Sequence, residues 1–285
     1  MNTFTRYLFW CLLIVPKKQL SRWVGRLART SFPKPFQEWL NRRFVQFFKI
    51  NMEEAILKNP AHYPNLNALF TRKIDLSRRP LAQTPLVHPA DSELRMVGNI
   101  GHQFFLQAKK VTYQLDDLIP TCDVQRYLNG QFILYYLGPS DYHRVHAPIG
   151  GRLVRIVHVP GTLWPVNAWS DRKINQVFIK NERVIFEFES EIGPLCLIMV
   201  GATNVGQISI ASLPLFLNWS LANRQICSFP LDGPIEVYKG DELATFEMGS
   251  TVIMLLSSSF RAFGINVSPW STPMLVKVRS ACFTK

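Results

Sequence analysis

The sequence predicts an α+β fold that is mostly β, with N-terminal helices followed by an antiparallel β-rich domain. From residue 85 onward, short apolar and β-branched runs alternate with turns made of Gly, Pro, Asn and Asp. Regularly spaced runs of this kind are typical of a mostly antiparallel β domain. Before residue 75 the apolar residues recur at helical spacing instead. We therefore expect a helical region over 1–75 and a β-rich domain over 76–285.

The N-terminus begins with nine apolar residues, 7–15, which are followed by a proline and two lysines. A helix that spans a bilayer needs roughly 20 apolar residues, so this run is too short to cross one. A cleaved signal peptide is the alternative, because Arg6 precedes a short apolar core. No small-residue cleavage site follows the run. We expect it to stay uncleaved and to lie at a membrane interface.

Two amphipathic helices are expected next, separated by Pro33 and Pro35. In the first, an apolar face lies apart from a face of three arginines, a pattern typical of helices in the headgroup region of a bilayer. The second runs from about Phe36 to Ile50, and its aromatic stripe is equally compatible with packing on the body of the protein. A short polar helix over Met52 to Lys58 is expected before the β-rich domain. The apolar faces are Leu20, Trp23, Val24 and Leu27 in the first helix, and Phe36, Leu40, Phe44, Phe47 and Phe48 in the second.

The formal charge of +12 is concentrated at the N-terminus. Residues 1–50 carry ten Lys or Arg and one acidic residue, Glu38, which gives +9. A basic segment of this kind binds nucleic acid or an anionic bilayer. Aromatic residues are interleaved with the cations throughout, which favours the membrane surface and argues against nucleic acid. We expect a peripheral protein on the cytoplasmic side of the cell (inner) membrane.

Nine β runs are expected in the second region, together with a short helix over Tyr113 to Ile119. Their composition, rich in Val, Ile, Phe and Leu between turn residues, is that of strands. The five cysteines are scattered, odd in number and without C-x-x-C spacing, so we expect reduced thiols rather than disulfides or a zinc knuckle. The expected strands are Gln103–Gln107, Gln131–Leu137, Leu153–His158, Val177–Ile179, Val184–Glu189, Leu195–Val200, Gly206–Ile210, Ile235–Tyr238 and Val252–Leu256.

The triplet Gly249-Ser250-Thr251 stands between a turn and the last apolar run. A glycine without Cβ lets the backbone bend and lets a nucleophile approach its carbonyl. The Ser250 hydroxyl, once a base removes its proton, can attack the carbonyl of Gly249 and convert the amide to an ester. β-Elimination of such an ester leaves dehydroalanine, which hydrolyses to a pyruvoyl group. The triplet alone is weak evidence, since most such triplets are turns or strand ends.

Four further segments accompany the triplet in a fixed order, and the set resembles the pyruvoyl-dependent phosphatidylserine decarboxylases of bacterial membranes. The similarity extends from about Phe70 to Leu256. Five ordered motifs over most of a chain are far more specific than any one of them. They are Pro89-Ala90-Asp91, Asp141-Tyr142-His143-Arg144-Val145-His146-Ala147-Pro148, Asn181-Glu182-Arg183-Val184, Val200-Gly201-Ala202-Thr203-Asn204-Val205-Gly206 and Met248-Gly249-Ser250-Thr251.

The resemblance implies a role for each motif residue that matches. Ser250 matches the self-cleaving serine that becomes the pyruvoyl group, and the cut would fall between Gly249 and Ser250. His146 matches the catalytic histidine and Asp91 the catalytic aspartate. An imidazole has a suitable pKa to act as base, and an aspartate can hold it in the useful tautomer, as in serine hydrolases.

Three positions depart from the family pattern, and three more are expected near the substrate. Met248 replaces the usual leucine, which is a volume-conserving change. Ser92 and Ala244 stand where the family usually has glycine, so these two departures concern local backbone geometry and not the chemistry. The residues expected near the substrate are His143, Tyr142 and Val166.

The resemblance also implies the reaction and the partners. The amine of phosphatidylserine forms a Schiff base with the Ser250-derived ketone, and carbon dioxide is lost to give phosphatidylethanolamine. This electron-sink chemistry is that of pyridoxal phosphate in other enzymes. His146 is also a candidate acid for returning the proton to Cα. The working enzyme would be a heterodimer of a large β chain, 1–249, and a small α chain, 250–285.

Three alternatives remain open from the residues themselves. A membrane-associated serine hydrolase would use Ser250, His146 and Asp91 without self-cleavage, although the Gly-x-Ser-x-Gly elbow is missing. A non-catalytic β-rich lipid-binding module would leave the chain intact. A zinc site could use His143 and His146 with either His102 or His158, but no motif places a third ligand and we expect no metal.

Overall fold

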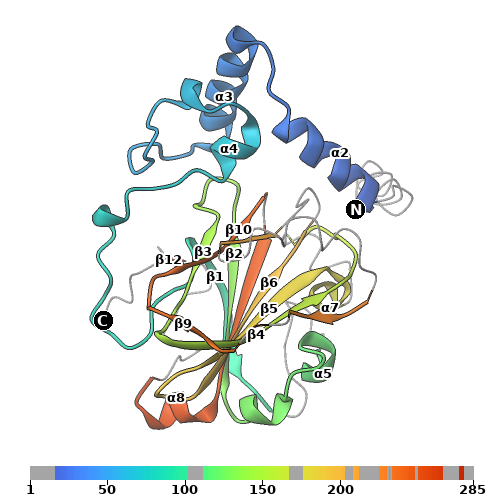
Figure 1. Cartoon of the computed structure of the whole chain (residues 1–285), viewed down its shortest axis with the longest axis vertical. Helices are drawn as coiled ribbons and strands as arrows, with labels where there is room; N and C mark the ends of the chain where they lie inside the picture. Colours follow the sequence, from blue (N-terminus) through green and yellow to red (C-terminus); the bar gives the residue numbers. More distant parts are fainter. Residues whose placement is uncertain are drawn as a thin grey trace.

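A β domain with a group of helices at one end makes up the structure, a computed structural model of the chain (Figure 1). It describes residues 17–101, 112–166, 176–202, 208–211, 225–229, 231, 233–247, 250–265 and 276–278. The expected apolar segment 7–15 and the expected strand Gln103–Gln107 lie outside these ranges. The mostly β fold with antiparallel sheets and few helices agrees with the fold class predicted from the sequence.

The helices at one end belong to residues 17–75, which we call the N-terminal arm. The long helices are α2 (Lys17–Arg29) and α3 (Lys34–Phe48), as the apolar spacing predicts. Pro35 stands in the first turn of α3, where its missing N–H costs nothing. The shorter turns of the arm and of the segment that follows are η1 (Pro60–His62), α4 (Leu66–Phe70) and η2 (Leu76–Arg78).

The prediction of a short polar helix over Met52 to Lys58 is wrong. This segment is extended enough to pair with residues 73–75: Ala55 bridges Ile74, and the backbone N–H of Asp75 donates to the carbonyl of Glu54 over 2.8 Å. An isolated helix this short is marginal by itself, so pairing with a neighbouring segment decides its conformation.

The main sheet contains nine of the described strands, in the order β12-β1-β2-β11-β6-β5-β4-β8, with β9 also paired to β4. All the pairs are antiparallel. The strands are β1 (Ser92–Asn99), β2 (Gln131–Leu137), β4 (Gly151–Val159), β5 (Arg183–Glu189), β6 (Pro194–Val200), β8 (Cys227–Ser228), β9 (Ile235–Val237), β11 (Ser250–Leu256) and β12 (Val276–Val278).

Strand β11 is central to this sheet and to the core. Every residue from Val252 to Leu256 is fully buried, between β2 on one side and β6 on the other. A strand covered on both faces has an unbroken apolar sequence rather than an alternating one. This explains why the run is among the clearest strand signals in the chain.

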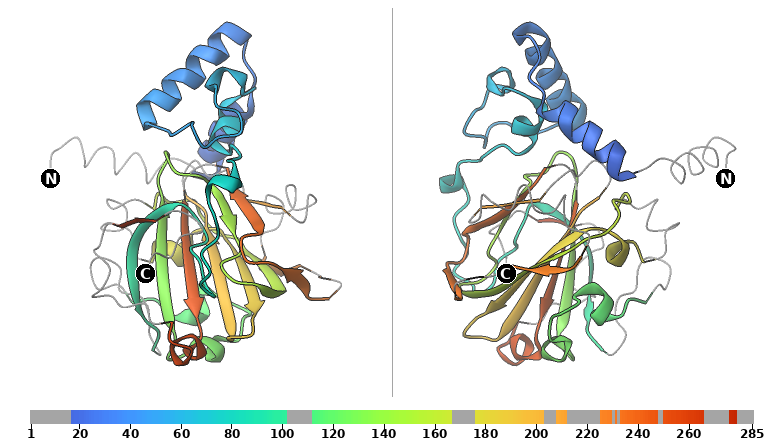
Figure 2. Two further views of the ribbon diagram at one scale, coloured as in Figure 1. Left: turned by 90° about the vertical axis from the view of Figure 1, so that its left-hand side faces the viewer. Right: turned by 45° about the vertical axis from the view of Figure 1, so that its right-hand side comes forward.

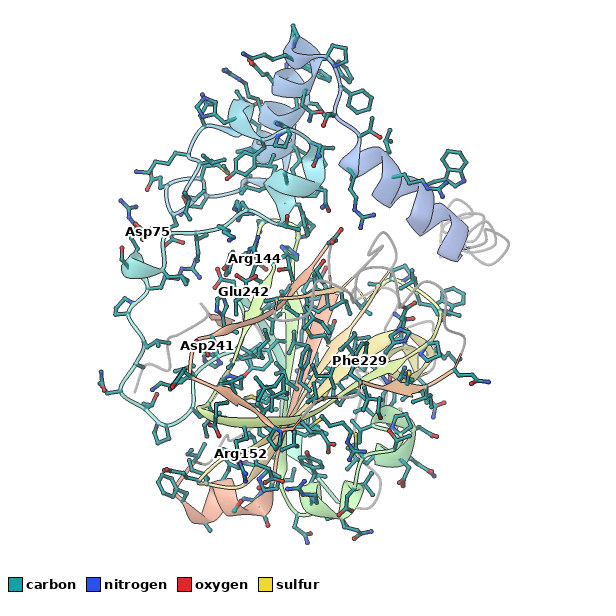
Figure 3. All side chains as sticks on the ribbon, viewed as in Figure 1. Asp75, Arg144, Arg152, Phe229, Asp241 and Glu242 are labelled. Atoms are coloured by element: carbon teal, nitrogen blue, oxygen red, sulfur yellow. The ribbon has the colours of Figure 1, made fainter. Side chains whose placement is uncertain are left out.

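A second, three-stranded sheet has β10 at its centre, in the order β3-β10-β7. Its strands are β3 (Arg144–His146), β7 (Ile208–Ile210) and β10 (Glu242–Phe246). Strands β3 and β10 are absent from the sequence prediction because they are short and carry the charged residues Arg144 and Glu242. These two side chains form an ion pair across the sheet and lie beside each other below the arm in Figure 3.

The remaining helices of the β domain are short. They are α5 (Leu115–Leu118), η3 (Val124–Tyr127), α7 (Val177–Lys180) and α8 (Ser258–Ala262). The strand expected over Val177–Ile179 is therefore wrong. A short apolar run is compatible with a buried helix or a buried strand, and here Val177 and Phe178 are buried as part of a helix.

Polar contacts join the arm to the β domain. Both views in Figure 2 show the arm helices together at one end of that domain. Arg144 donates from Nη2 to the carbonyl of Thr71 over 2.9 Å, and Arg72 donates to the carbonyl of Ser140 over 3.0 Å. Within the described ranges no helix has the length and hydropathy needed to span a bilayer. Of the described cysteines, Cys122, Cys196 and Cys227 are free thiols, as the sequence predicts.

Candidate active site

Strand β3, which carries His146 and directly follows His143, lies against β10, the strand that leads to the expected cleavage bond. In the small sheet His146 pairs with Glu242, at the start of β10. At the other end the backbone N–H of Phe246 donates to the carbonyl of His143 over 2.9 Å. The chain then passes through residues 247–249 into β11. Gly249 and the side chain of Ser250 lie outside what the structure describes.

Ser250 is the first residue of β11 and pairs with Leu137 at the end of β2. Its neighbour Thr251 is 1% exposed and pairs with Val200, which ends β6 and begins the fourth motif. The start of β11 therefore lies beside the end of β2, from which the chain continues to β3 and His146. Thr203 and Asn204 of the fourth motif fall outside the described residues.

The His146 side chain is fixed at both ring nitrogens. Nδ1 lies 2.7 Å from the carbonyl oxygen of Gly240 and Nε2 lies 3.2 Å from the hydroxyl of Tyr142. A carbonyl oxygen only accepts, so in the neutral ring Nδ1 carries the proton and Nε2 holds the lone pair. Burial lowers the pKa of His146, and the Gly240 hydrogen bond and the charges of Glu242 and Asp91 oppose that effect. The imidazole is thus a neutral base at Nε2 near pH 7.

The turn that presents the Gly240 carbonyl is held on two sides. The N–H of Gly240 donates to the carbonyl of Ala147, and the N–H of Ala147 donates to the carbonyl of Asp241. Lys239 donates from Nζ to the carbonyls of Ala82 and Thr84, 2.8 and 2.7 Å away. Gly240 has φ +93°, a backbone conformation that favours glycine.

Asp91 is buried and forms an ion pair with Arg79. The same guanidinium donates to Glu54 of the arm over 2.5 Å and lies 5.8 Å from the centre of the Tyr142 ring. The sequence hypothesis gives Asp91 the task of orienting His146, but the Gly240 carbonyl faces Nδ1. The carboxylate of Asp91 acts on His146 through its charge, which raises the pKa of the imidazole.

His143 directly precedes β3 and is fully buried. Its Nδ1 lies 2.8 Å from the carbonyl oxygen of Asp141, and the Phe70 ring centre is 3.9 Å from its own. Its Nε2 has no hydrogen-bond partner among the described residues. Burial lowers the pKa of His143 to about 3, so the ring is neutral. Because Nδ1 faces a carbonyl oxygen and carries the proton, Nε2 holds a lone pair that can only accept a hydrogen bond.

A cavity of about 300 Å³ opens beside His146. Its polar side is formed by His146, His88 and Arg79, and its apolar side includes Leu76 and Leu81 of the segment joining the arm to the β domain. Burial lowers the pKa of His88 to about 4, and its Nδ1 lies 3.2 Å from the Tyr135 hydroxyl. A pocket with apolar walls and a few fixed polar groups is the usual form of a small-ligand site.

Other motif residues brace the fold. The side chain of Asn181 donates to the carbonyls of Trp164 and Gly201 and accepts from the N–H of Trp164, each over 2.8 Å. The fully buried Arg183 donates to backbone carbonyls, including that of Leu118 at 2.7 Å. Val166, expected near the substrate, is buried and belongs to the main hydrophobic core.

No cluster of three or more His, Cys, Asp or Glu suited to a metal ion is present in the described part of the chain. His158, one of the two candidates for a third zinc ligand, lies on β4 with Nε2 3.0 Å from Glu182. The other candidate, His102, is outside the described ranges.

The motifs predict His146, Asp91 and Tyr142 as site residues, and the structure brings Arg79 and Gly240 to them as well. Arg79 lies outside all five motifs. Gly240 also lies outside the motifs, and a backbone carbonyl contributes to a site without any residue-type signal. Only the fold reveals that this carbonyl faces an imidazole 94 residues away in the sequence.

Comparison with known proteins gives a consistent result. A family model described as phosphatidylserine decarboxylase matches residues 66–278. The chain is 33% identical over 274 residues to a phosphatidylserine decarboxylase proenzyme of Idiomarina loihiensis, covering 93% of this chain and 92% of the relative. It is 36% identical over 266 residues to the proenzyme of Variovorax paradoxus, covering 90% of each chain. The proenzyme of Coxiella burnetii is 33% identical over 266 residues, covering 90% of this chain and 92% of the relative.

Proposed function

The chain belongs to the phosphatidylserine decarboxylase family, and we propose that it makes its own catalytic ketone by cutting the bond between Gly249 and Ser250. The activity is that of a carboxy-lyase, which converts phosphatidylserine to phosphatidylethanolamine and carbon dioxide. The observation that best supports the self-cleavage is the state of His146. It is a neutral imidazole with its proton on Nδ1, on a strand paired with β10, which leads into the cleavage segment.

In the proposed self-cleavage, Nε2 of His146 takes the proton of the Ser250 hydroxyl, and Oγ attacks the Gly249 carbonyl carbon. The C–N bond between Gly249 and Ser250 breaks, which leaves an ester to Oγ and a free amino group on Ser250. Loss of the Cα proton and of the Gly249 carboxylate gives dehydroalanine. Water then replaces the nitrogen, which leaves as ammonia. The products are a chain ending at Gly249 and a chain beginning with a pyruvoyl group.

Each described residue has a definite part in this scheme. The Gly240 carbonyl keeps the proton on Nδ1, so that Nε2 is the basic atom. Asp91 favours the protonated imidazole that forms when the serine loses its proton. The hydroxyl of Tyr142 lies at Nε2 and can carry a proton between that atom and the cavity.

The residues around Ser250 fit a pyruvoyl group at that position. Thr251 and the core strand behind it are buried, so the first residue of β11 is held by pairing to β2. When present, the ketone supplies the electron sink for loss of carbon dioxide. We assign the lone pair on Nε2 of His143, which lacks a partner among the described residues, to accept a hydrogen bond from the substrate.

We further propose that the arm lies on an anionic membrane, at the cytoplasmic face of the cell (inner) membrane. In α3 the burial pattern is the reverse of that expected for a helix that packs only on protein. The residues of α3 that are buried are the polar Gln37 and Asn41, which bond to each other over 2.8 Å. The exposed surface of α2 and α3 combines large apolar and aromatic side chains with arginines, which suits an anionic lipid interface. Its members include Trp23 at 69%, Leu27 at 61%, Phe36 at 48%, Trp39 at 51% and Phe47 at 79% exposure.

Denaturing electrophoresis with mass spectrometry tests the self-cleavage. Active protein should separate into fragments 1–249 and 250–285, the second with a keto acyl group at its blocked amino end and inactivated by hydroxylamine. Ser250→Ala should stay as one inactive chain. Active wild-type protein that is a single uncut polypeptide, insensitive to hydroxylamine, would refute the proposal and favour a serine hydrolase. A chain that binds lipid and tolerates His146→Ala without loss of function would favour the non-catalytic module.

A further inference from the structure

Glu247, two residues before the proposed cleavage bond, binds donors from three separate elements. Its carboxylate is 9% exposed. Ser209 of β7 donates to Oε1 over 2.5 Å. On Oε2, Arg29 of α2 donates from Nε over 2.9 Å and also from Nη2, and Asn67 of α4 donates over 3.4 Å. Donors 218, 180 and 38 residues away in the sequence therefore meet on one side chain.

The donors from the arm are themselves held together. Arg29 ends α2, and its carbonyl accepts from Nδ2 of Asn65 over 3.1 Å. The other side of that amide, Oδ1 of Asn65, accepts from the N–H of Ala68 and so caps α4. Since Asn67 stands in the first turns of this helix, α2 and α4 present Arg29 and Asn67 to Glu247 as one unit.

A carboxylate this well buried is costly to desolvate unless it is paired and hydrogen-bonded. The contacts to Arg29, Ser209 and Asn67 meet that requirement. They also fix the chain on one side of the cleavage bond. On the other side, Ser250 is fixed by its pairing with Leu137. A peptide held at both ends needs less reorganisation to bring a hydroxyl onto the preceding carbonyl.

We propose that Glu247 is a positioning residue for self-cleavage and that the N-terminal arm supplies its counter-charge through Arg29. The inference rests on the proposed cleavage at Gly249–Ser250. It gives the arm a second role beside lipid contact, because the end of α2 completes the support of the segment that is cut. The arm and the cleavage reaction are then coupled through the contacts of Arg29 and Asn67 with Glu247.

Arg29→Met tests the proposal with little risk to the fold, because the Arg29 side chain is 38% exposed. We expect self-cleavage of the freshly synthesised full-length chain to slow about tenfold, as loss of a hydrogen bond to a charged group does. Arg29→Lys should restore part of the rate, because it returns the charge without the planar fork. Glu247→Gln, which keeps the shape and removes the charge, should slow cleavage to a similar degree.

Arg126→Met is the matched control. Arg126 forms an ion pair with Glu189, with side-chain exposures of 29% and 32%. Glu189 pairs with Pro194, at the end of the sheet where β11 finishes, and Ser250 is at the end where it begins. We expect this variant to cleave at the wild-type rate. Thermal unfolding of Arg29→Met, Glu247→Gln and Arg126→Met, each made uncleavable with Ser250→Ala, shows whether stability accounts for any change.

The outcomes separate the two proposals. The positioning role is supported if Arg29→Met and Glu247→Gln cleave slowly while their melting temperatures are no lower than that of Arg126→Met. Wild-type cleavage rates in both variants overturn it and leave the proposed function intact. Slow cleavage that follows a matching loss of melting temperature also overturns it, since the pair would then be structural. Wild-type protein that never cleaves overturns the proposed function itself.

Discussion

Gly240→Ala tests how His146 is oriented, because this glycine carries the carbonyl that faces Nδ1. An alanine at φ +93° adopts a backbone conformation that costs about 1–2 kcal/mol. Its Cβ would also lie 2.9 Å from Cδ1 and 3.0 Å from Cδ2 of Leu81, closer than carbon atoms normally approach. Leu81 is 41% exposed, so its side chain can move away in part, and the turn itself must move for the rest.

Movement of this turn shifts the carbonyl oxygen that lies 2.7 Å from the imidazole. Without that acceptor the proton is free to occupy Nε2, which removes the basic atom from the side of Tyr142. Misplacement by about 1 Å costs roughly 10²-fold in rate. The stability loss of about 1–2 kcal/mol is small against the 5–15 kcal/mol of a typical domain. We therefore expect a folded protein that cleaves about 10²-fold more slowly.

The assay is a time course of fragments 1–249 and 250–285 on denaturing gels after synthesis of the full chain. Gly233→Ala is the control: its φ is +135°, and no described atom lies within 4 Å of the added Cβ. It carries a comparable backbone cost without affecting His146, and should cleave at the wild-type rate. Adding Leu81→Ala to Gly240→Ala should recover part of the rate. A folded Gly240→Ala protein that cleaves as fast as the wild type would refute the orienting role of this carbonyl.

Three further predictions concern charge, pH and the membrane. Asp91→Asn should slow cleavage about tenfold or more, because the imidazole loses the anion that favours its protonated form; unchanged processing would leave Asp91 a structural role. The lowered pKa of His88, about 4 against 6.5, means that the unfolded chain binds the proton first as the pH falls. Stability is therefore complete above pH 6.5 and falls between pH 6.5 and 4, by about 3 kcal/mol from this residue alone. Denaturant titrations at pH 7 and 5 measure the loss, and His88→Gln should reduce it; equal stability at both pH values would contradict the assignment. Trp23→Ser with Leu27→Ser should weaken binding to anionic vesicles by about 10²-fold or more, given the usual value of burying such side chains. Phe263→Ser, at an exposed aromatic beside α8, should not weaken it. Flotation of the wild type and both variants with vesicles measures the binding, and equal binding of the wild type and the double variant would contradict the prediction.

Burial explains which strands could be predicted. Gln131–Leu137 was predicted with the bounds that β2 has, and the run at Val252–Leu256 lies within β11. Both are buried on two faces and therefore unambiguous in sequence. By contrast, β1 (Ser92–Asn99) contains Glu93, Arg95 and Gly98, and was missed. Its position depends on pairing with β2 rather than on its own composition.

Only those site residues that belong to a sequence motif could be predicted. Ser250, His146 and Asp91 are recognisable because surrounding residues identify them, and those assignments stay predictions until cleavage is measured. The expected triad failed to anticipate that a carbonyl would take the orienting position at Nδ1. Nothing in the sequence relates Glu247 to Arg29, because their contact depends on how α2 meets the end of β10. Long-range polar contacts of this kind come from the fold.

The position of the proposed cut explains how the two fragments would stay together. Residues 247–249 connect the centre of the small sheet to the centre of the large one, so a break there removes a connection but no strand pairing. The small fragment begins with β11, whose residues pair with β2 from Ser250 to Leu256 and with β6 from Thr251 to Leu256. The side chains of Val252 to Leu256 are fully buried, and each contributes about 1.5–3 kcal/mol. Release of the fragment would expose that core and leave β2 and β6 each unpaired along one edge. The fold therefore allows a covalent bond at its active site to be broken while the architecture around it remains assembled.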